Sequence, residues 1–256
     1  MRNYYYFDGH KFEQQELRLM MDAVVSAQVI TETEKENIIK KIKTLTSKST
    51  AESLQNQIHI NKSASSTNQE VKYHISKLHE AIHDEKIINF TYGRYDLNKE
   101  FILSKKGEAR KLKPYALHWN NDHYYLIGMN DEDHIIHLRV DRLKSVEITE
   151  EPFTRDQHFN ISNYTEKLFH MYSGEVKFLK IEFDNQLINV IIDRFGLDSN
   201  VESADEDKFI LRTHAAISDG LFRWLLTWES DARVIDPPEL AKRIKEEGLK
   251  MLEKYR

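Results

Sequence analysis

The spacing of apolar residues along the chain changes from helical to extended and back, and these changes predict its elements. Apolar residues three and four apart predict helices over about 17–28 and 31–45. The second opens with Thr31 and Glu34, which form a capping-box pattern. We therefore expect two short antiparallel helices whose apolar stripe needs a partner. A third helix is predicted over about 68–84, with an N-cap near 65–67.

Around residue 86 the apolar period changes to two, which is the period of a strand. Ile88, Phe90 and Tyr92 alternate with polar residues, and further short apolar runs follow up to about residue 149. The segments 120–122 and 130–133 carry the turn residues that join hairpin strands. Five or six short antiparallel strands in about 65 residues favour a small barrel over an open sheet.

The last third of the chain repeats an alternation of strand and helix. Residues 153–173 mix aromatic and polar groups in short turns, and a strand is predicted from about 176. The alternation ends in a helix that opens at Pro237 and Pro238. It predicts a small α+β sandwich. The predicted fold class is thus α+β, with N-terminal helices, a small antiparallel β-barrel and this sandwich.

These changes of pattern predict four consecutive regions. They are a helical connector (1–60), a β-barrel domain with its leading helix (61–151), a linker (152–173) and a C-terminal α+β extension (174–256).

Composition narrows the function classes. The chain has 256 residues with 40% apolar and 31% charged, which is typical of a globular protein. A formal net charge of −5 excludes a protein that coats nucleic acid by bulk charge, so any such contact needs a local patch. The absence of cysteine excludes disulfides, thiolate zinc sites and cysteine nucleophiles. The sequence has no membrane-spanning apolar run and no signal peptide, so we expect a cytoplasmic protein.

The stretch 134–142 is the richest in candidate chemistry. We predict a strand from His134 to Val140. Its period of two places Ile136, Leu138 and Val140 on a core face, with His137, Arg139 and Asp141 on the opposite face. The neighbouring hairpin strands offer further polar aromatic residues, namely Tyr115, His118, Tyr124 and Tyr125. Arginines beside aromatic rings on a sheet can bind a phosphate or a stacked base. The alternative is an arginine paired with Asp141 on a solvated face.

Other patterns argue against metal and enzyme chemistry. His74, His79 and His83 share one predicted helix, but no third zinc ligand lies in line with the last two. The sequence contains no Gly-rich phosphate loop and no nucleophile elbow. We expect no metal, no cofactor and no enzymatic activity. A phosphodiesterase that uses His137 with Asp141 stays open as a minor alternative.

Several segments together resemble a known family. The run 113–128 with Tyr124-Tyr125-Leu126, and the run 137–143 with Arg139 and Arg142, resemble a WYL domain, although the family name has Trp where Tyr124 stands. Residues 174–256 resemble the extension that commonly follows WYL domains. Residues 4–45 resemble the helical connector that usually joins a WYL domain to a DNA-binding domain. Such proteins usually begin with a winged helix-turn-helix, and this sequence starts where that module would end.

The resemblance implies an Sm-like or SH3-like barrel that senses a ligand for a bacterial transcription regulator. It places Tyr125, Arg139 and Arg142 in a pocket for a nucleotide or short nucleic acid. Strand proximity adds Tyr115 and His118, and His137 is added from the strand face that it shares with Arg139. The expected partners are a second copy of the chain, DNA through the helix-turn-helix that this sequence lacks, and a small anionic ligand or single-stranded nucleic acid. A dimerisation module without a ligand is the alternative.

Overall fold

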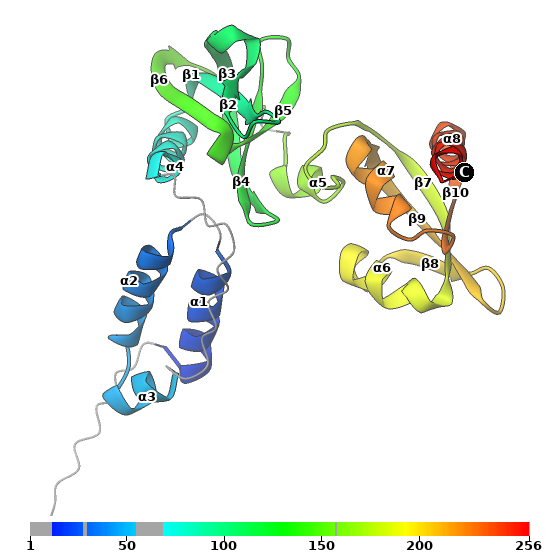
Figure 1. Cartoon of the computed structure of the whole chain (residues 1–256), viewed down its shortest axis with the longest axis horizontal. Helices are drawn as coiled ribbons and strands as arrows, with labels where there is room; N and C mark the ends of the chain where they lie inside the picture. Colours follow the sequence, from blue (N-terminus) through cyan, green and yellow to red (C-terminus); the bar gives the residue numbers. More distant parts are fainter. Residues whose placement is uncertain (1–11, 28–29, 55–68, 157, 256) are drawn as a thin grey trace, which may run out of the picture.

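The computed structural model describes residues 12–27, 30–54, 69–156 and 158–255. A helical part, a curled sheet and a second sheet with helices follow one another along the chain (Figure 1).

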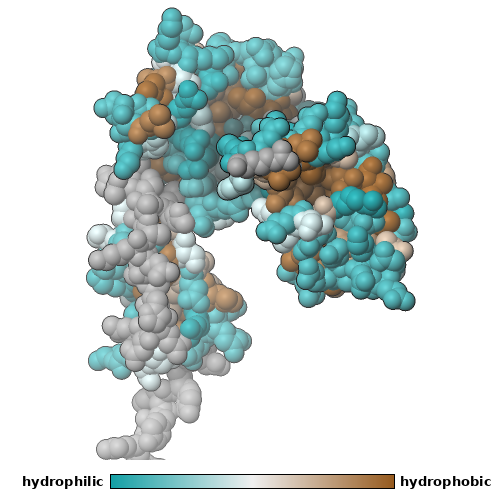
Figure 2. Space-filling view, turned by 45° about the vertical axis from the view of Figure 1, so that its right-hand side comes forward, coloured by the Kyte–Doolittle hydropathy of each residue, from teal (hydrophilic) through white to brown (hydrophobic). Residues whose placement is uncertain are grey.

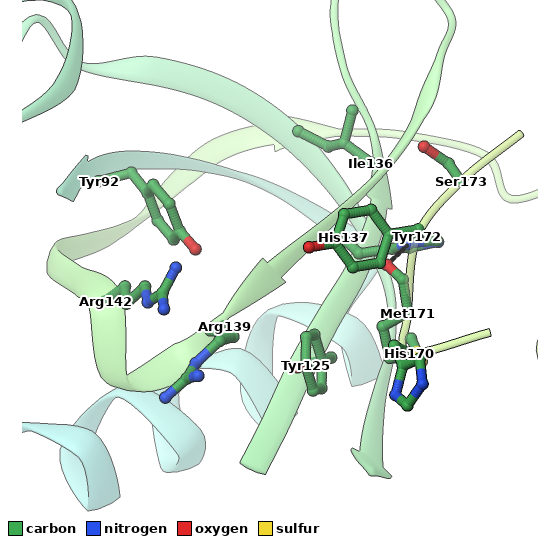
Figure 3. Close-up of a pocket in the computed structure, with 10 residues that line it drawn as sticks. All are labelled: Tyr92, Tyr125, Ile136, His137, Arg139, Arg142, His170, Met171, Tyr172 and Ser173. Carbon is green, nitrogen blue, oxygen red and sulfur yellow. Dashed lines mark hydrogen bonds between the residues drawn. The ribbon is translucent and has the colours of Figure 1, made fainter. Parts of the chain in front are cut away.

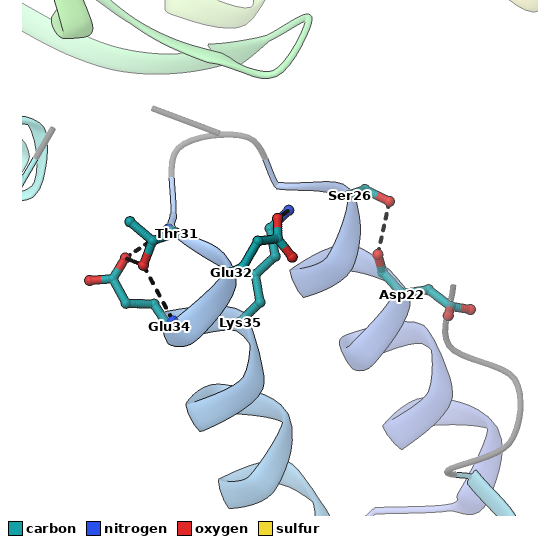
Figure 4. Close-up of polar contacts among 6 residues, drawn as sticks. All are labelled: Asp22, Ser26, Thr31, Glu32, Glu34 and Lys35. Carbon is teal, nitrogen blue, oxygen red and sulfur yellow. Dashed lines mark hydrogen bonds and ion pairs between the residues drawn. The ribbon is translucent and has the colours of Figure 1, made fainter. Parts of the chain in front are cut away.

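The helical part contains α1 (Gln14–Ser26), α2 (Glu32–Lys43) and α3 (Lys48–Ser53). Leu17 and Met21 of α1 and Ile39 of α2 are buried against one another. The predicted capping box at Thr31 is confirmed, because the Thr31 hydroxyl accepts from the Glu34 amide while the Glu34 carboxylate accepts from the Thr31 amide (Figure 4). The two predicted helices are therefore confirmed, and they pack on each other.

The middle part is a six-stranded antiparallel sheet that follows α4 (Gln69–His83). Its strands are β1 (Lys86–Tyr95), β2 (Phe101–Leu103), β3 (Arg110–Asn120), β4 (His123–Met129), β5 (Ile135–Arg139) and β6 (Leu143–Pro152). Their hydrogen-bonded order is β2–β1–β3–β4–β5, and β6 pairs with β1. Among the described strands β5 and β6 are not paired with each other, so the predicted barrel is a curled half-barrel.

Strand alternation places the core of this sheet against α4. Ile88 and Phe90 of β1 and Leu126 of β4 are fully buried and pack on Val71 and Leu78 of α4. The hairpin predicted at 120–122 is confirmed, with Asn121 and Asp122 both at positive φ, as a two-residue turn of type I′ requires.

The strand predicted through Val140 ends earlier. β5 stops at Arg139, and Val140–Arg142 form one turn of 3-10 helix before β6. Asp141 is therefore not on a strand face with His137 and Arg139. Val140 is fully buried, as its apolar pattern predicts.

The segment between the two sheets includes α5 (Ile161–Thr165), and hydrogen bonds to its backbone carbonyls hold it to the C-terminal part. The Ala216 amide donates to the Lys167 carbonyl at 3.0 Å. The Arg194 guanidinium donates to the carbonyls of Glu166 and Leu168 at 3.2 and 2.8 Å.

The C-terminal part is a four-stranded antiparallel sheet in the order β10–β7–β9–β8. Its strands are β7 (Glu175–Asp184), β8 (Asn200–Ser203), β9 (Lys208–Ile217) and β10 (Ala232–Asp236). Its helices are α6 (Ile188–Phe195), α7 (Asp219–Leu226) and α8 (Pro238–Lys254). The connectivity β–α–β–β–α–β with this strand order is that of ferredoxin-like folds, with α8 added.

The predicted α+β class and the three-part architecture are confirmed. Helix α6 ends at Gly196, which takes a positive φ of +84°. The N-cap predicted near 65–67 lies outside the described residues. In the part of the chain that the structure describes, no helix is long and apolar enough to cross a membrane.

Candidate ligand pocket

A cavity of about 450 Å³ lies where the half-barrel meets the segment that leads into β7. Its walls combine four parts of the chain: β1, β4, β5 with the following 3-10 turn, and residues 170–173 (Figure 3). The lining residues are Tyr92, Tyr125, Ile136, His137, Arg139, Arg142, His170, Met171, Tyr172 and Ser173. Four of the six predicted site residues, Tyr125, His137, Arg139 and Arg142, are therefore brought together.

Arg139 faces the pocket but is already paired. Its Nε and Nη2 donate to the two carboxylate oxygens of Asp141 at 3.0 and 2.7 Å, and Nη2 also donates to His123 Nδ1 at 3.2 Å. Burial disfavours the charged Asp141 carboxylate, but the hydrogen bonds and charge of Arg139 outweigh it and lower the pKa of Asp141. The arginine–carboxylate pair weighed as an alternative is thus present, inside the pocket wall rather than on a solvated face.

Arg142 adds a second positive charge to the pocket, and the Asp141 carboxylate is already paired with Arg139. Within the described ranges its guanidinium makes no hydrogen bond or salt bridge, and its side chain is half-buried. Figure 3 places Arg142 beside Tyr92, at the end of the pocket away from His170. Two guanidinium groups against one carboxylate give the pocket a net positive charge, which favours an anionic ligand.

His137 joins the half-barrel to the pocket's other wall. Its Nδ1 lies 2.7 Å from the Met171 carbonyl and its Nε2 lies 3.0 Å from the Tyr164 hydroxyl. A carbonyl only accepts, so Nδ1 carries the hydrogen and Nε2 accepts from Tyr164. Burial lowers the pKa of His137 and keeps this ring neutral, and burial raises the pKa of Tyr164 to about 12. Both ring nitrogens are occupied, and neither bonds to Asp141, the partner that the phosphodiesterase alternative needs.

Tyr115 and His118 do not line the pocket. Tyr115 is 3% exposed and stacks on Phe153, with ring centroids 6.0 Å apart. A β-bulge between Pro114 and Ala116 changes the direction of this part of β3. Pro114 was the available signal, since a proline inside a sheet is confined to edges and bulges. His118 lies opposite Tyr125 on β3, and its half-buried position lowers its pKa.

Sequence reasoning missed the lining residues outside β4, β5 and the following turn. Tyr92 lies on β1, where its alternation with Phe90 predicts a core position and does not indicate that it also lines the pocket. His170 and Met171 have positive φ, 50° and 60°, in a segment with no glycine before Gly174. No sequence pattern indicates that this segment turns back onto β5.

Among the described residues, no group of three or more His, Cys, Asp or Glu side chains is placed to hold a metal ion. The ring of His74 is buried, at 4% exposure.

Comparison with solved structures gives matches at low sequence identity. Proteasome accessory factor B/C (PafBC) of Arthrobacter aurescens is 13% identical over 91% of this chain, with a TM-score of 0.34, and this chain spans 34% of its length. A structure described as a CRISPR Cas-related protein is 10% identical over 97% of this chain and 75% of its own, with a TM-score of 0.50. At 10% identity the likeness to this second structure bears on the fold alone. No curated protein matches the chain.

Two family models match separate parts of the sequence. The WYL domain model matches residues 73–148, which span α4 and the strands of the half-barrel. The WCX domain model matches residues 177–252, which span the ferredoxin-like part and most of α8. The chain therefore carries a WYL domain over residues 73–148 followed by a WCX domain over residues 177–252.

Proposed function

We propose that this chain is the ligand-sensing and dimerisation part of a WYL-type transcription regulator, and that its pocket binds a nucleotide or a short nucleic acid. The observation that carries the proposal is the half-buried Arg142 without a salt-bridge partner among the described residues, in a cavity of about 450 Å³. A guanidinium in such a site offers a planar pair of donors to a phosphate.

The aromatic lining supports the same ligand class. Tyr92 and Tyr125 stand on either side of the two arginines and offer flat faces with polar rims (Figure 3). A base on one ring and a phosphate at Arg142 fit within one pocket. A cavity of this size suits a mononucleotide or one or two residues of a longer strand.

The position of the pocket also suggests how a bound ligand would change the arrangement of the WYL and WCX domains. Its wall at 170–173 belongs to the segment that His137 ties to the WYL domain and that Ala216 and Arg194 tie to the WCX domain. A ligand that displaces this wall would shift the two domains, and so the DNA binding of a helix-turn-helix in the same regulator, by favouring one arrangement over another. We propose a cytoplasmic location with this role.

The test is a titration of the whole chain with mononucleotides and with a labelled short oligothymidylate. We expect Arg142→Ala to abolish measurable mononucleotide binding and Arg142→Lys to weaken it, because lysine keeps the charge but not the planar donors. Arg223→Ala, on an exposed site of α7, is the control and keeps wild-type affinity. Equal affinity of wild type and Arg142→Ala would remove the proposed site.

A dimerisation module without a ligand is the second candidate, and the Arg139–Asp141 pair favours it because one arginine is already neutralised. If the chain is a dimerisation module without a ligand, no nucleotide changes its melting temperature. We propose a binding protein rather than an enzyme. If the chain hydrolyses nucleotide phosphodiesters and His137→Ala abolishes this activity, the chain is an enzyme and this proposal is wrong.

Self-association is proposed through the C-terminal domain. Figure 2 shows apolar surface gathered on that domain, on the side turned to the reader. Leu249 and Leu252 of α8 are each 54% exposed and three residues apart, which places them on one side of the helix. Tyr255, directly after the helix, is 92% exposed. Such a stripe is typical of a helix that packs against a partner.

A further inference from the structure

The WCX sheet is covered by helices on only one of its faces. Leu179, Ile181 and Phe183 of β7 point to the covered face and pack with buried residues of α6, α7 and α8. The intervening residues of β7 point to the opposite face, since side chains alternate along a strand. At one end of that opposite face, Ala216 of β9 is buried in a cluster with Leu168 and Met171. No described helix packs on the rest of it, and we call its stretch from Phe178 to Glu182 of β7, with the β9 residues opposite, the open face.

The open face carries an aromatic pair on its two central strands. Phe178 of β7 stands directly opposite His214 of β9, with ring centroids 5.6 Å apart and an interplanar angle of 68°. Phe178 is 42% exposed, and His214 is also exposed. No hydrogen bond to the His214 ring is formed by any described residue. Two exposed rings at the centre of a solvent-facing sheet indicate a contact surface rather than a core.

Cations occupy the next positions of the same face. Lys180 and Arg212 are the cross-strand pair that follows Phe178 and His214 along the two strands. Arg212 pairs with Glu202 of β8, an exposed ion pair. Lys180 makes no hydrogen bond or salt bridge within the described part of the chain.

The far end of the open face is occupied by an ion-pair network. Glu182 accepts from Arg233 at 2.8 Å and from Lys208 at 3.3 Å. Arg233 is 70% exposed in its side chain, so its remaining donors stay available to a ligand. Exposed pairs of this kind contribute little energy and yield to a phosphate.

We propose that the open face of the WCX domain binds a single-stranded nucleic-acid segment, with a base stacked on Phe178 and backbone phosphates at Lys180 and Arg212. Stacking accepts any base, because every base has a flat aromatic face. Lys180 follows Phe178 by two strand residues, about 7 Å, which places its ammonium beside the phosphate of a base on that ring. A duplex hides its base faces, so single strands are selected.

This site is separate from the WYL pocket and does not depend on the function proposed for it. The pocket is lined by residues of the WYL domain and of 170–173, and none of the open-face residues named above belongs to it. A mononucleotide is large enough to test the pocket but too short to span the open face.

The experiment measures fluorescence anisotropy of a labelled oligothymidylate with the whole chain. We expect Phe178→Ala to weaken binding by about tenfold, the order expected for the loss of one stacked base. Phe178→Leu, which keeps apolar area but no flat ring, is expected to lose about as much. Val176→Ala, on the same exposed edge of β7, is the matched control and keeps wild-type affinity. Lys180→Gln is expected to weaken binding and to reduce its dependence on salt.

Each other outcome contradicts the proposal. If the wild-type chain does not bind the oligothymidylate, or if both Phe178 variants bind it as wild type does, the open face is not a nucleic-acid site. If Phe178→Ala changes the molar mass in solution but not the affinity, the face is a contact between two copies. If Arg142→Ala removes mononucleotide binding while the Phe178 variants keep oligonucleotide affinity, the pocket proposal stands and this one fails.

Discussion

Arg139 and Arg142 both face the WYL pocket, but the structure uses their charges differently. Arg139→Ala leaves the Asp141 carboxylate, 26% exposed, without its donors, so we expect a loss of about 1–3 kcal/mol in the free energy of unfolding. Arg142→Ala breaks no hydrogen bond found among the described residues, and we expect a change within about 0.5 kcal/mol. Urea denaturation of both variants measures this difference. Equal destabilisation would mean that Arg142 has a structural partner and is not held for a ligand.

His137 makes the stability of the chain sensitive to acid. Burial lowers its pKa in the folded state, so the unfolded chain binds more protons below the usual histidine value of 6.5. Stability is therefore full above that value and falls as the pH drops below it. His118 and His123, whose pKa values are also lowered by burial, add to the same loss. We expect the melting temperature to fall between about pH 7 and about pH 5.

The control for this pH effect is His137→Gln, which keeps a polar side chain but cannot take up a proton. It is expected to lower the melting temperature at about pH 8, because the bonds to Met171 and Tyr164 are weakened, and to give a shallower fall on acidification. A slope as steep as that of the wild type would show that His137 contributes nothing to the acid response.

At the level of single residues, the sequence was sufficient to find side chains and partners that are close in sequence, but not partners from distant segments. Tyr125 and Arg139 could be picked from residue type and strand position, which depend on the local sequence, and the resemblance to a WYL domain added Arg142. The pair of Arg139 with Asp141, two residues apart, is one of the two alternatives that the sequence offers. The bond of His137 to Met171 instead depends on the fold-back of a segment 34 residues away. Contacts of this second kind depend on tertiary packing and leave no periodic signal.

The elements themselves were largely predictable, and the exceptions have physical reasons. Helices with a clear apolar period and a capping residue, such as α2 after Thr31, lie close to their predicted bounds. β5 is shorter than predicted because the buried Val140 belongs to a 3-10 turn, where burial does not require a strand. The half-barrel closes less than the predicted barrel, since closure depends on whether β5 and β6 pair and not on either strand's pattern.

At the scale of elements, the close approach of Gly220 of α7 to Phe169 holds the segment before residue 170 against the WCX domain. An added Cβ at Gly220 of α7 would lie 2.0 Å from the Phe169 carbonyl oxygen, so no larger residue fits without moving the segment before residue 170. We expect Gly220→Ala to destabilise the chain by about 1–3 kcal/mol and to weaken mononucleotide binding. Urea denaturation and the titration described above measure both effects.

Gly248→Ala is the matched control for that substitution. Gly248 lies in α8 with nothing within 4 Å of the added Cβ, and the same change there is expected to stabilise the helix by about 0.5–1 kcal/mol. If Gly220→Ala proves as harmless as Gly248→Ala, the segment is free to move away from α7, and the coupling proposed between the pocket and the WCX domain loses its mechanical basis.

At the scale of the whole molecule, the apolar side of α8 predicts the assembly. Leu249, Leu252 and Tyr255 remain exposed while Leu240, earlier on the same helix, is buried in the WCX core. The helix thus continues past the domain that anchors it, and covering its free end needs a second surface.

We expect light scattering after size exclusion to give the mass of a dimer for the wild type and of a monomer for Leu249→Gln with Leu252→Gln. Lys250→Gln, an exposed polar site between them, should leave the dimer intact. Because dimerisation stabilises by mass action, the wild-type melting temperature should rise with protein concentration and that of the double variant should not. A wild type that stays monomeric at every concentration, with a melting temperature independent of it, would place dimerisation outside this chain and leave ligand binding as its whole contribution to regulation.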